Sequence, residues 1–188
     1  MRNKITITIF TTLLMITFGL NAHAQETPSS SRRHGLGFSG GWGAPYGLGF
    51  LYNYSFNQKW DAHIGTGLTL SGGRVGAGAR YYFKPKHSPY LGATYSYSSG
   101  IDQYDVTINE DSGSYEIGSS SALYLRGGYK FDFSRFRILL NAGYGTTVTT
   151  AELTHLSGDN TNTLRNSAYR MEVGGVEVST TFIFKFGK

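Results

Sequence analysis

The chain has no cysteine among its 188 residues. It therefore has no disulfide bond, and it has no cysteine to which a lipid anchor could be attached after export. Disulfides are the usual support of small exported domains. If this chain is exported, its own hydrogen bonds and packing must stabilise it without them.

Long helices are also missing from the sequence pattern. Beyond residue 24, no apolar run approaches the ~20 residues that a membrane-spanning helix requires. No segment repeats its apolar residues with a helical period, and the 26 glycines disfavour long helices. These absences leave β-strands as the expected regular structure.

The N-terminus has the pattern of a secretory signal peptide. Arg2 and Lys4 precede an apolar run over residues 5–20, and the small-residue sequence AHA ends at Ala24. The run is shorter than a spanning helix, which disfavours the alternative of an N-terminal membrane anchor. We therefore predict that residues 1–24 are a signal peptide, with cleavage near Ala24.

The remaining chain is only mildly basic. Removing Arg2 and Lys4 from the 17 basic residues leaves 15, against 12 acidic residues. This balance gives no indication of nucleic-acid binding. Residues 25–34 are polar and are predicted to be a disordered segment. Residues 35–188 then have the length of one domain.

Period-two alternation is the dominant pattern of that domain. In each of eight segments, every second residue is mostly apolar and the residues between are small, polar or charged. Residues 176–188 are an example, since Val178, Phe182 and Phe184 alternate with Ser179, Thr181 and Lys185. The predicted strands are 35–43, 46–56, 60–70, 74–83, 90–98, 121–131, 136–148 and 176–188.

The connections between these strands differ in length at the two ends. Three connections are short, whereas the segments 99–120 and 149–168 are long and lie on the side opposite the chain termini. Short turns on one side and long loops on the other are typical of outer-membrane barrels and not of soluble sandwiches. The predicted fold is therefore all-β, an eight-stranded antiparallel up-and-down transmembrane barrel with its apolar faces toward lipid.

Aromatic residues support this interpretation. Many of them lie near the short-turn end, where they would form an interfacial girdle, and a smaller set would form a second girdle. The first set is Phe56, Trp60, Tyr81, Phe83, Tyr90, Phe131, Phe133, Phe136, Phe184 and Phe186. The second set is Trp42, Tyr46, Tyr95 and Tyr97.

The whole pattern resembles the small eight-stranded outer-membrane β-barrel family, of the OmpA/OmpX type. The resemblance rests on the signal peptide, the eight strands, the loop asymmetry and the aromatic alternation from Phe182 to Phe186. It implies a monomer in the outer membrane of a Gram-negative bacterium. It also implies that outer-membrane lipid, lipopolysaccharide and the barrel-insertion machinery are partners, and that no cofactor is bound. Gly187 and Lys188 depart from the terminal aromatic residue that many such barrels carry.

The faces opposite the apolar ones are expected to point into the barrel lumen. An isolated buried charge is costly, so the lumen charges must be paired or hydrated. We predict that Asp61 and Glu177 accept hydrogen bonds from Arg80 and Arg126 in a structural polar plug, with a gate or narrow anion path as the alternative. His63 is expected to be a hydrogen-bonded lumen residue and not a metal ligand or base. The predicted lumen residues are Asp61, His63, Arg74, Arg80, Arg126, Lys130, Arg137, Glu177 and Lys185.

Glycines occupy many inward positions in the outer half of the strands. This distribution predicts a lumen that is closed near the short turns and roomier above, with a small pocket that opens outward. The alternative is that these glycines only permit strong bending of a tight barrel. The glycines are Gly47, Gly49, Gly65, Gly67, Gly76, Gly78, Gly143 and Gly145.

The long segment 99–120 keeps its alternation beyond the expected membrane. It predicts a projecting hairpin with a turn at residues 110–113 and a bulge near Gly100. An exposed strand edge can capture a partner strand, and adhesive members of the resembled family use such protrusions. The hairpin is acidic, but its spacing does not match a calcium-binding loop, so no metal site is predicted. The expected contacts to a host or surface ligand are Tyr104, Val106, Ile108, Tyr115 and Ile117.

A weak candidate for catalysis lies in the last long segment. His155 and Ser157, with Glu152 and Glu172 nearby, could activate a serine for acyl hydrolysis. Lipid A deacylases are similar in this small respect. The predicted function is nevertheless a non-enzymatic outer-membrane barrel with a structural or surface-interaction role. The alternatives are a lipid-modifying hydrolase and a narrow pore or small-ligand-binding barrel.

Overall fold

The computed structural model describes residues 32–108, 111–169 and 174–187. The predicted signal peptide and most of the predicted polar segment lie outside these ranges. The end of that segment, residues 32–34, joins the barrel wall. Arg32 donates to the carbonyl oxygen of Lys185 at 3.2 Å, and the Arg33 carbonyl accepts from the Ser55 amide at 2.7 Å. The first strand then begins at His34.

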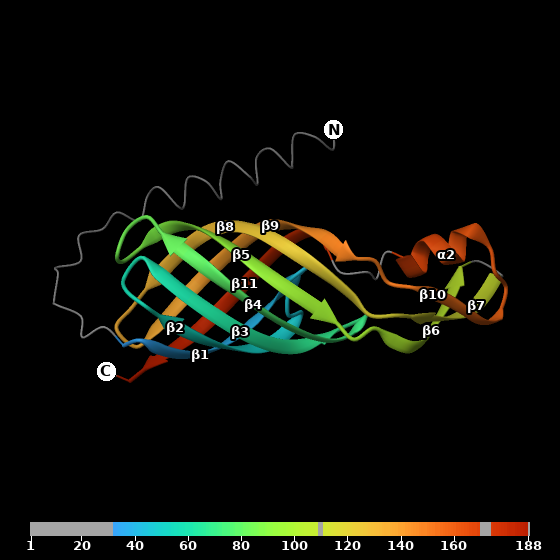
Figure 1. The fold of residues 1–188 in the computed structure, drawn as a ribbon, viewed down its shortest axis with the longest axis horizontal. Coiled ribbons are helices and arrows are strands. Elements are labelled where there is room, and N and C mark those ends of the chain that lie inside the picture. The colour runs from blue at the N-terminus through green and yellow to red at the C-terminus, as the bar shows by residue number, and fades with distance from the viewer. Residues whose placement is uncertain (1–31, 109–110, 170–173, 188) are drawn as a thin grey trace, which may run out of the picture.

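Eight antiparallel strands of the described chain form a closed barrel, so the prediction of an all-β, eight-stranded antiparallel barrel is confirmed (Figure 1). Around the barrel the order is β1-β11-β9-β8-β5-β4-β3-β2, and β1 pairs with β2 to complete the circle. Closure leaves no unpaired strand edge in the barrel. The strands are β1 (His34–Trp42), β2 (Leu48–Ser55), β3 (Trp60–Thr69), β4 (Gly72–Tyr82), β5 (Ser88–Ser98), β8 (Ser120–Asp132), β9 (Phe136–Thr149) and β11 (Gly175–Phe186).

The barrel is apolar outside and polar inside, as the alternation predicts. Phe50, Leu68 and Leu125 are 70%, 71% and 66% exposed on the outer wall. Asp61 and Glu177, on the opposite faces of their strands, are completely buried. A two-layer sandwich would reverse this distribution, because its apolar faces would meet in a core.

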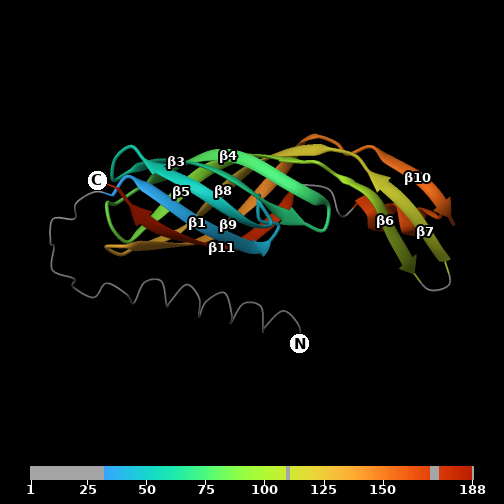
Figure 2. The same ribbon diagram turned by 90° about the horizontal axis from the view of Figure 1, so that it is seen from below.

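A second unit projects from the end of the barrel opposite the C-terminus (Figures 1 and 2). It is a three-stranded sheet in the order β10-β7-β6, carrying the short helix α2. We refer to it as the extension. Its elements are β6 (Ile101–Ile108), β7 (Asp111–Ile117), β10 (Leu153–Gly158) and α2 (Asn162–Tyr169).

The extension is more regular than the sequence indicated. The segment 149–168 was expected to be a loop, but it contains β10 and most of α2. The Thr161 hydroxyl accepts from the Leu164 amide at 3.4 Å, which caps the first turn of α2. Of the predicted turn at 110–113, residues 111–113 belong to β7, and residue 110 lies outside the described ranges. The expected bulge appears as a register shift between Ile101 and Tyr104.

No helix in the described ranges is long and apolar enough to span a membrane.

Two tyrosines were assigned to the wrong face of the wall. Tyr46 and Tyr90 were expected in the aromatic girdles, but each is only 1% exposed and points into the barrel. Tyr46 precedes Gly47, whose φ of +63° ends the alternation of β2, so the parity of that strand does not extend to Tyr46. Tyr90 has the inward parity of β5 and pairs across the strands with inward-facing Tyr82. Both rings therefore fill lumen space.

Candidate functional site

Asp61 is the centre of a buried ion-pair network in the lumen. Its Oδ1 accepts from Arg80 at 3.3 Å, and its Oδ2 accepts from Arg137 at 2.9 Å and from the Tyr82 hydroxyl at 2.5 Å. Arg80 also donates to Asn53 at 3.0 Å. One carboxylate thus holds two guanidinium groups, and the side chains of Asp61 and Arg80 are completely shielded from solvent.

A second pair lies farther around the wall. Arg126 donates to Glu177, and the Ser179 hydroxyl donates to the same carboxylate oxygen at 2.6 Å. The Thr94 hydroxyl then links this pair to His63, because it lies 3.5 Å from Arg126 Nη1 and 3.2 Å from His63 Nε2. Asp61 and Glu177 therefore each receive one of the two predicted arginines. His63 has a hydroxyl neighbour, as expected for a lumen residue.

A third group lies next to the short turns. Asp132 accepts from Lys185 at 2.6 Å and from Arg137 at 3.2 Å, and Lys130 Nζ lies 3.8 Å from its Oδ2. Lys130 also donates to the Pro85 carbonyl at 2.8 Å. Asp132 was missed in the sequence because it is the last residue of β8, where the alternation ends. The shared Arg137 joins this group to Asp61.

Strand register explains how such long side chains fit a narrow lumen. Arg80 pairs with Gly92, Gly92 with Arg126, Arg126 with Gly143, and Gly143 with Glu177. Residues with long charged side chains thus alternate with glycines at one level around the inside of the wall. A Cβ at Gly92 would lie 3.2 Å from Arg80 Cγ, and one at Gly143 would lie 3.0 Å from Arg126 Cβ. The glycines make room for their neighbours' charged groups.

The prediction of a pocket in the upper lumen is wrong, because aromatic rings fill the space beside the glycines. A Cβ at Gly65 or Gly76 would contact the Tyr46 ring at 2.8 or 3.0 Å, and one at Gly145 would contact the Tyr124 ring at 2.6 Å. Tyr124 is completely buried. These rings were not foreseen, because Tyr46 was assigned to the outer face.

The upper lumen also contains a cation, Arg74, that donates to uncharged groups. Arg74, 7% exposed, donates to the Ala44 carbonyl at 3.3 Å and to the Ser71 hydroxyl at 3.1 Å. The turn between β1 and β2 supplies Ala44, so it helps to close the barrel mouth. The upper lumen is a plug of rings and one guanidinium group.

The extension has a small core of its own. Val106, Tyr115 and Leu164 pack together and are buried, and Leu153 packs against them. The hairpin face that was predicted to contact a partner is therefore largely covered, since Val106, Tyr115 and Ile117 are buried and Tyr104 and Ile108 are partly buried. That face lies under α2, where it stabilises the extension. The residues affected are Tyr104, Val106, Ile108, Tyr115 and Ile117.

His155 and Ser157 were expected to lie in a loop, but they lie in the strand β10. A register shift separates them, so that His155 pairs with Tyr115 and Ser157 with Ser114. Adjacent residues of β7 face opposite sides, and cross-strand partners share a side. His155 and Ser157 therefore lie on opposite faces of the sheet, and the predicted dyad is not formed. Glu172 lies outside the described residues.

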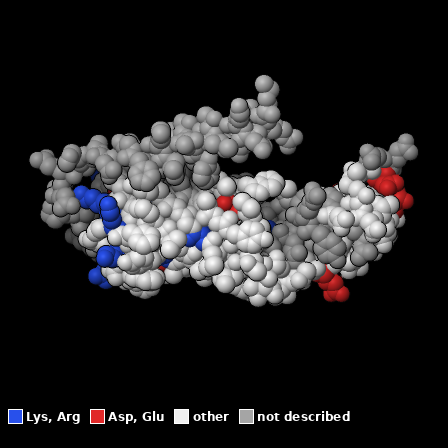
Figure 3. Space-filling model, turned by 90° about the horizontal axis from the view of Figure 1, so that it is seen from above, with Lys and Arg blue, Asp and Glu red and all other residues white. Residues whose placement is uncertain are grey.

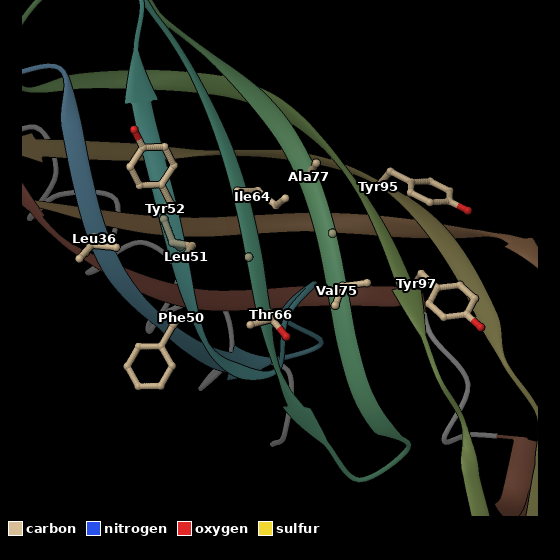
Figure 4. A pocket seen from close by; sticks show the side chains of 12 residues that line it. Leu36, Phe50, Leu51, Tyr52, Ile64, Thr66, Val75, Ala77, Tyr95 and Tyr97 are labelled. Carbon is tan, nitrogen blue, oxygen red and sulfur yellow. The ribbon is translucent and has the colours of Figure 1, made fainter.

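The outer wall carries an apolar groove across β1 to β5 (Figure 4). Its volume is about 570 Å³, and small residues such as Gly65 and Ala77 form its floor. In Figure 4, Phe50, Tyr52, Tyr95 and Tyr97 project from the strands that border it. Its chemistry suits hydrocarbon chains. Within the described ranges, no cluster of three or more histidine or acidic residues has the arrangement of a metal site.

Comparison with known proteins supports the architecture. No family model and no curated protein sequence matches the chain. The crystal structure of the N-terminal β-barrel domain of Pseudomonas aeruginosa OprF is similar, with a TM-score of 0.53 and 12% identity. The alignment covers 83% of this chain and 98% of that domain. At this identity the likeness shows the fold alone.

Proposed function

We propose that the chain is an integral outer-membrane β-barrel of a Gram-negative bacterium that presents the extension for surface recognition. The observation that carries the proposal is the exposed apolar wall around a charged, ion-paired lumen. In water, such a wall would be a very large exposed apolar patch. In a bilayer it faces acyl chains, and the barrel satisfies every strand edge internally.

The charge distribution agrees with this placement. In Figure 3, basic side chains gather toward the short-turn end and acidic ones on the extension, with a mainly uncharged wall between them. The short turns between strands carry exposed Lys59, Lys84 and Arg135, whereas Asp102, Asp105 and the other acidic residues of the extension project at the far end. The short turns then face the periplasm and the extension faces outward. Lipopolysaccharide surrounds the outer half of the wall, and the barrel-insertion machinery assembles the monomer.

The extension is the part suited to recognition. It is a regular sheet with two edge strands, β6 and β10, and residues 154–158 of β10 are all exposed. Exposed edges can add a strand from a partner. Acidic side chains at Asp102, Asp105, Glu116 and Glu152 favour a basic partner. We assign no catalytic role, and the filled lumen favours a structural barrel over an open pore.

Heat-modifiable migration tests the barrel assignment. The protein, extracted from outer membranes in mild detergent, is expected to migrate faster unheated than boiled, because a closed barrel resists the detergent. Recovery in the soluble periplasmic fraction would refute the membrane assignment.

A variant that lacks the extension tests the recognition role. Residues 101–117 and 151–173 are replaced by short glycine-serine turns, and cells that display either form are compared for attachment to epithelial cells and to one another. We expect attachment to fall while the heat-modifiable band is retained. A control with Asp102→Asn, Asp105→Asn and Glu116→Gln keeps the sheet and should weaken attachment to a basic partner. Equal attachment by all three forms would refute the recognition role and leave the barrel assignment intact.

A further inference from the structure

Several buried donors in the middle of the lumen have no partner within the described structure. Arg80 has two such groups, Nε and Nη2, and Arg126 has Nε. Tyr46 Oη and His63 Nδ1 are also buried without partners. A buried donor that lacks an acceptor destabilises the fold, because it has lost its hydrogen bonds to water. All these groups can donate, so together they suit an acceptor that is not part of the chain.

The buried charges of the lumen do not balance either. Among the described residues, six cationic side chains are buried in the barrel, whereas three carboxylates pair with them, and one of these, Asp132, is partly exposed. Water could satisfy the free donors, but it could not compensate the excess positive charge. The cations are Arg74, Arg80, Arg126, Lys130, Arg137 and Lys185, and the carboxylates are Asp61, Asp132 and Glu177.

The unpartnered donors of Arg80, Arg126 and His63 come from a short arc of the wall, formed by β3, β4, β5 and β8. Arg80 and Arg126 flank Gly92 on adjacent strands, so their α-carbons are separated by about 10 Å across a residue without a side chain. His63 lies two residues from Asp61 on the same face of β3, and its ring centroid is 6.1 Å from that of Tyr46. Tyr46 lies above the arginines and separates this level from the outer mouth.

We propose that the lumen binds one monovalent inorganic anion of chloride size between Arg80 and Arg126, with Tyr46 and His63 as further donors. His63 donates from Nδ1 when its Nε2 accepts from the Thr94 hydroxyl. The Oε2 atom of Glu177 is the unpartnered acceptor of this region, and a water molecule that enters with the anion would donate to it. The site is an internal counter-ion that completes the plug.

Anomalous diffraction with bromide tests the site directly. Crystals of the whole protein in detergent are grown in bromide, and an anomalous peak is expected at hydrogen-bond distance from both guanidinium groups. The peak should vanish in Arg80→Met, in which Asp61 keeps Arg137 and Tyr82. The control is Lys185→Met, which removes an equal charge at the short-turn end of the lumen and leaves Asp132 paired with Arg137. The anomalous peak should persist in this variant. Density without anomalous signal, or a peak unchanged in Arg80→Met, would overturn the proposal.

Thermal unfolding in solution tests whether the anion also binds at concentrations below those used for crystals. At constant ionic strength, chloride is exchanged for gluconate, which is too large for the lumen. The unfolding temperature is expected to rise by roughly 3–6 °C for each tenfold increase in chloride above its dissociation constant. Lys185→Met should keep this dependence and Arg80→Met should lose it. If Arg80→Met does not fold, the wild-type protein decides, because equal stability in the two salts would overturn the proposal.

Discussion

Asp61 offers the sharpest test of the lumen network. In Asp61→Asn, the side chain keeps its size, but the two guanidinium groups of Arg80 and Arg137 lose their common carboxylate. Breaking a buried ion pair from one side costs about 3–5 kcal/mol, because the remaining charge stays desolvated. Arg137 keeps Asp132 and Arg80 keeps Asn53, so we expect a loss within this range and not twice as large. Total stabilities of about 5–15 kcal/mol make this a severe defect.

Reversible urea unfolding in lipid vesicles measures this loss. Trp42 and Trp60 face outward, 79% and 48% exposed, so their fluorescence reports departure from lipid. Asp102→Asn on the exposed part of β6 is the matched control and should change stability by less than about 0.5 kcal/mol. A loss below about 1 kcal/mol in Asp61→Asn would refute the reasoning, because the lumen would then be hydrated.

A double-mutant cycle separates charge from shape. Arg80→Met removes one of the two cations that Asp61 holds. When it is combined with Asp61→Asn, the total loss should be smaller than the sum of the single losses by about 0.5–3 kcal/mol. Strict additivity would show that the two residues do not interact across the lumen.

Three further perturbations address the wall, the extension and the glycines. Leu125→Arg places a charge in the middle of the outer wall and should cost about 2–4 kcal/mol in vesicles, whereas Leu156→Arg on the extension should be nearly neutral; equal effects on the unfolding midpoint would contradict the membrane placement. Tyr115→Ala removes the centre of the extension's core, so limited proteolysis should cut the extension while the heat-modifiable barrel survives, and an uncut extension would refute the importance of that core. Gly143→Ala places a Cβ 2.6 Å from the Leu125 carbonyl oxygen and should reduce the yield of folded barrel, whereas Gly73→Ala meets nothing closer than 3.6 Å, so equal yields would contradict the packing argument.

The alternation of apolar and polar residues in the sequence was sufficient to predict the barrel. Wherever a strand is long and uninterrupted, parity alone assigns each side chain to the wall or the lumen, as for Phe182 outside and Lys185 inside. A strand has only two faces, so one clear apolar position fixes all the others. The lumen charges other than Asp132 followed from the same rule.

Apart from Tyr90, which lies at a regular inward position of β5, the failures occurred where the backbone departs from a regular strand. Gly47 has a left-handed backbone conformation, and Tyr46 before it turns into the lumen. The register shift after His155 breaks the alternation of β10, so the segment reads as a loop in sequence. Among the side chains of α2 that the structure describes, Leu164 is the apolar anchor, and the position of the helix depends on packing against a sheet whose edges come from distant parts of the chain. Local periodicity contains no signal for such contacts.

The pairing of β1 with β11 has a consequence for biogenesis. Nine residue pairs, from His34 with Phe186 to Trp42 with Val178, join the first and the last strands of the barrel in chain order. Until β11 pairs with β1, every partly paired form of the barrel exposes two unpaired strand edges and an apolar outer surface. The entropic cost of closing so long a loop grows only logarithmically with its length, so closure is affordable in free energy. It is slow, however, and the apolar surface stays exposed to water meanwhile. The proposed export therefore requires that the partly paired chain be protected from aggregation until β1 and β11 meet.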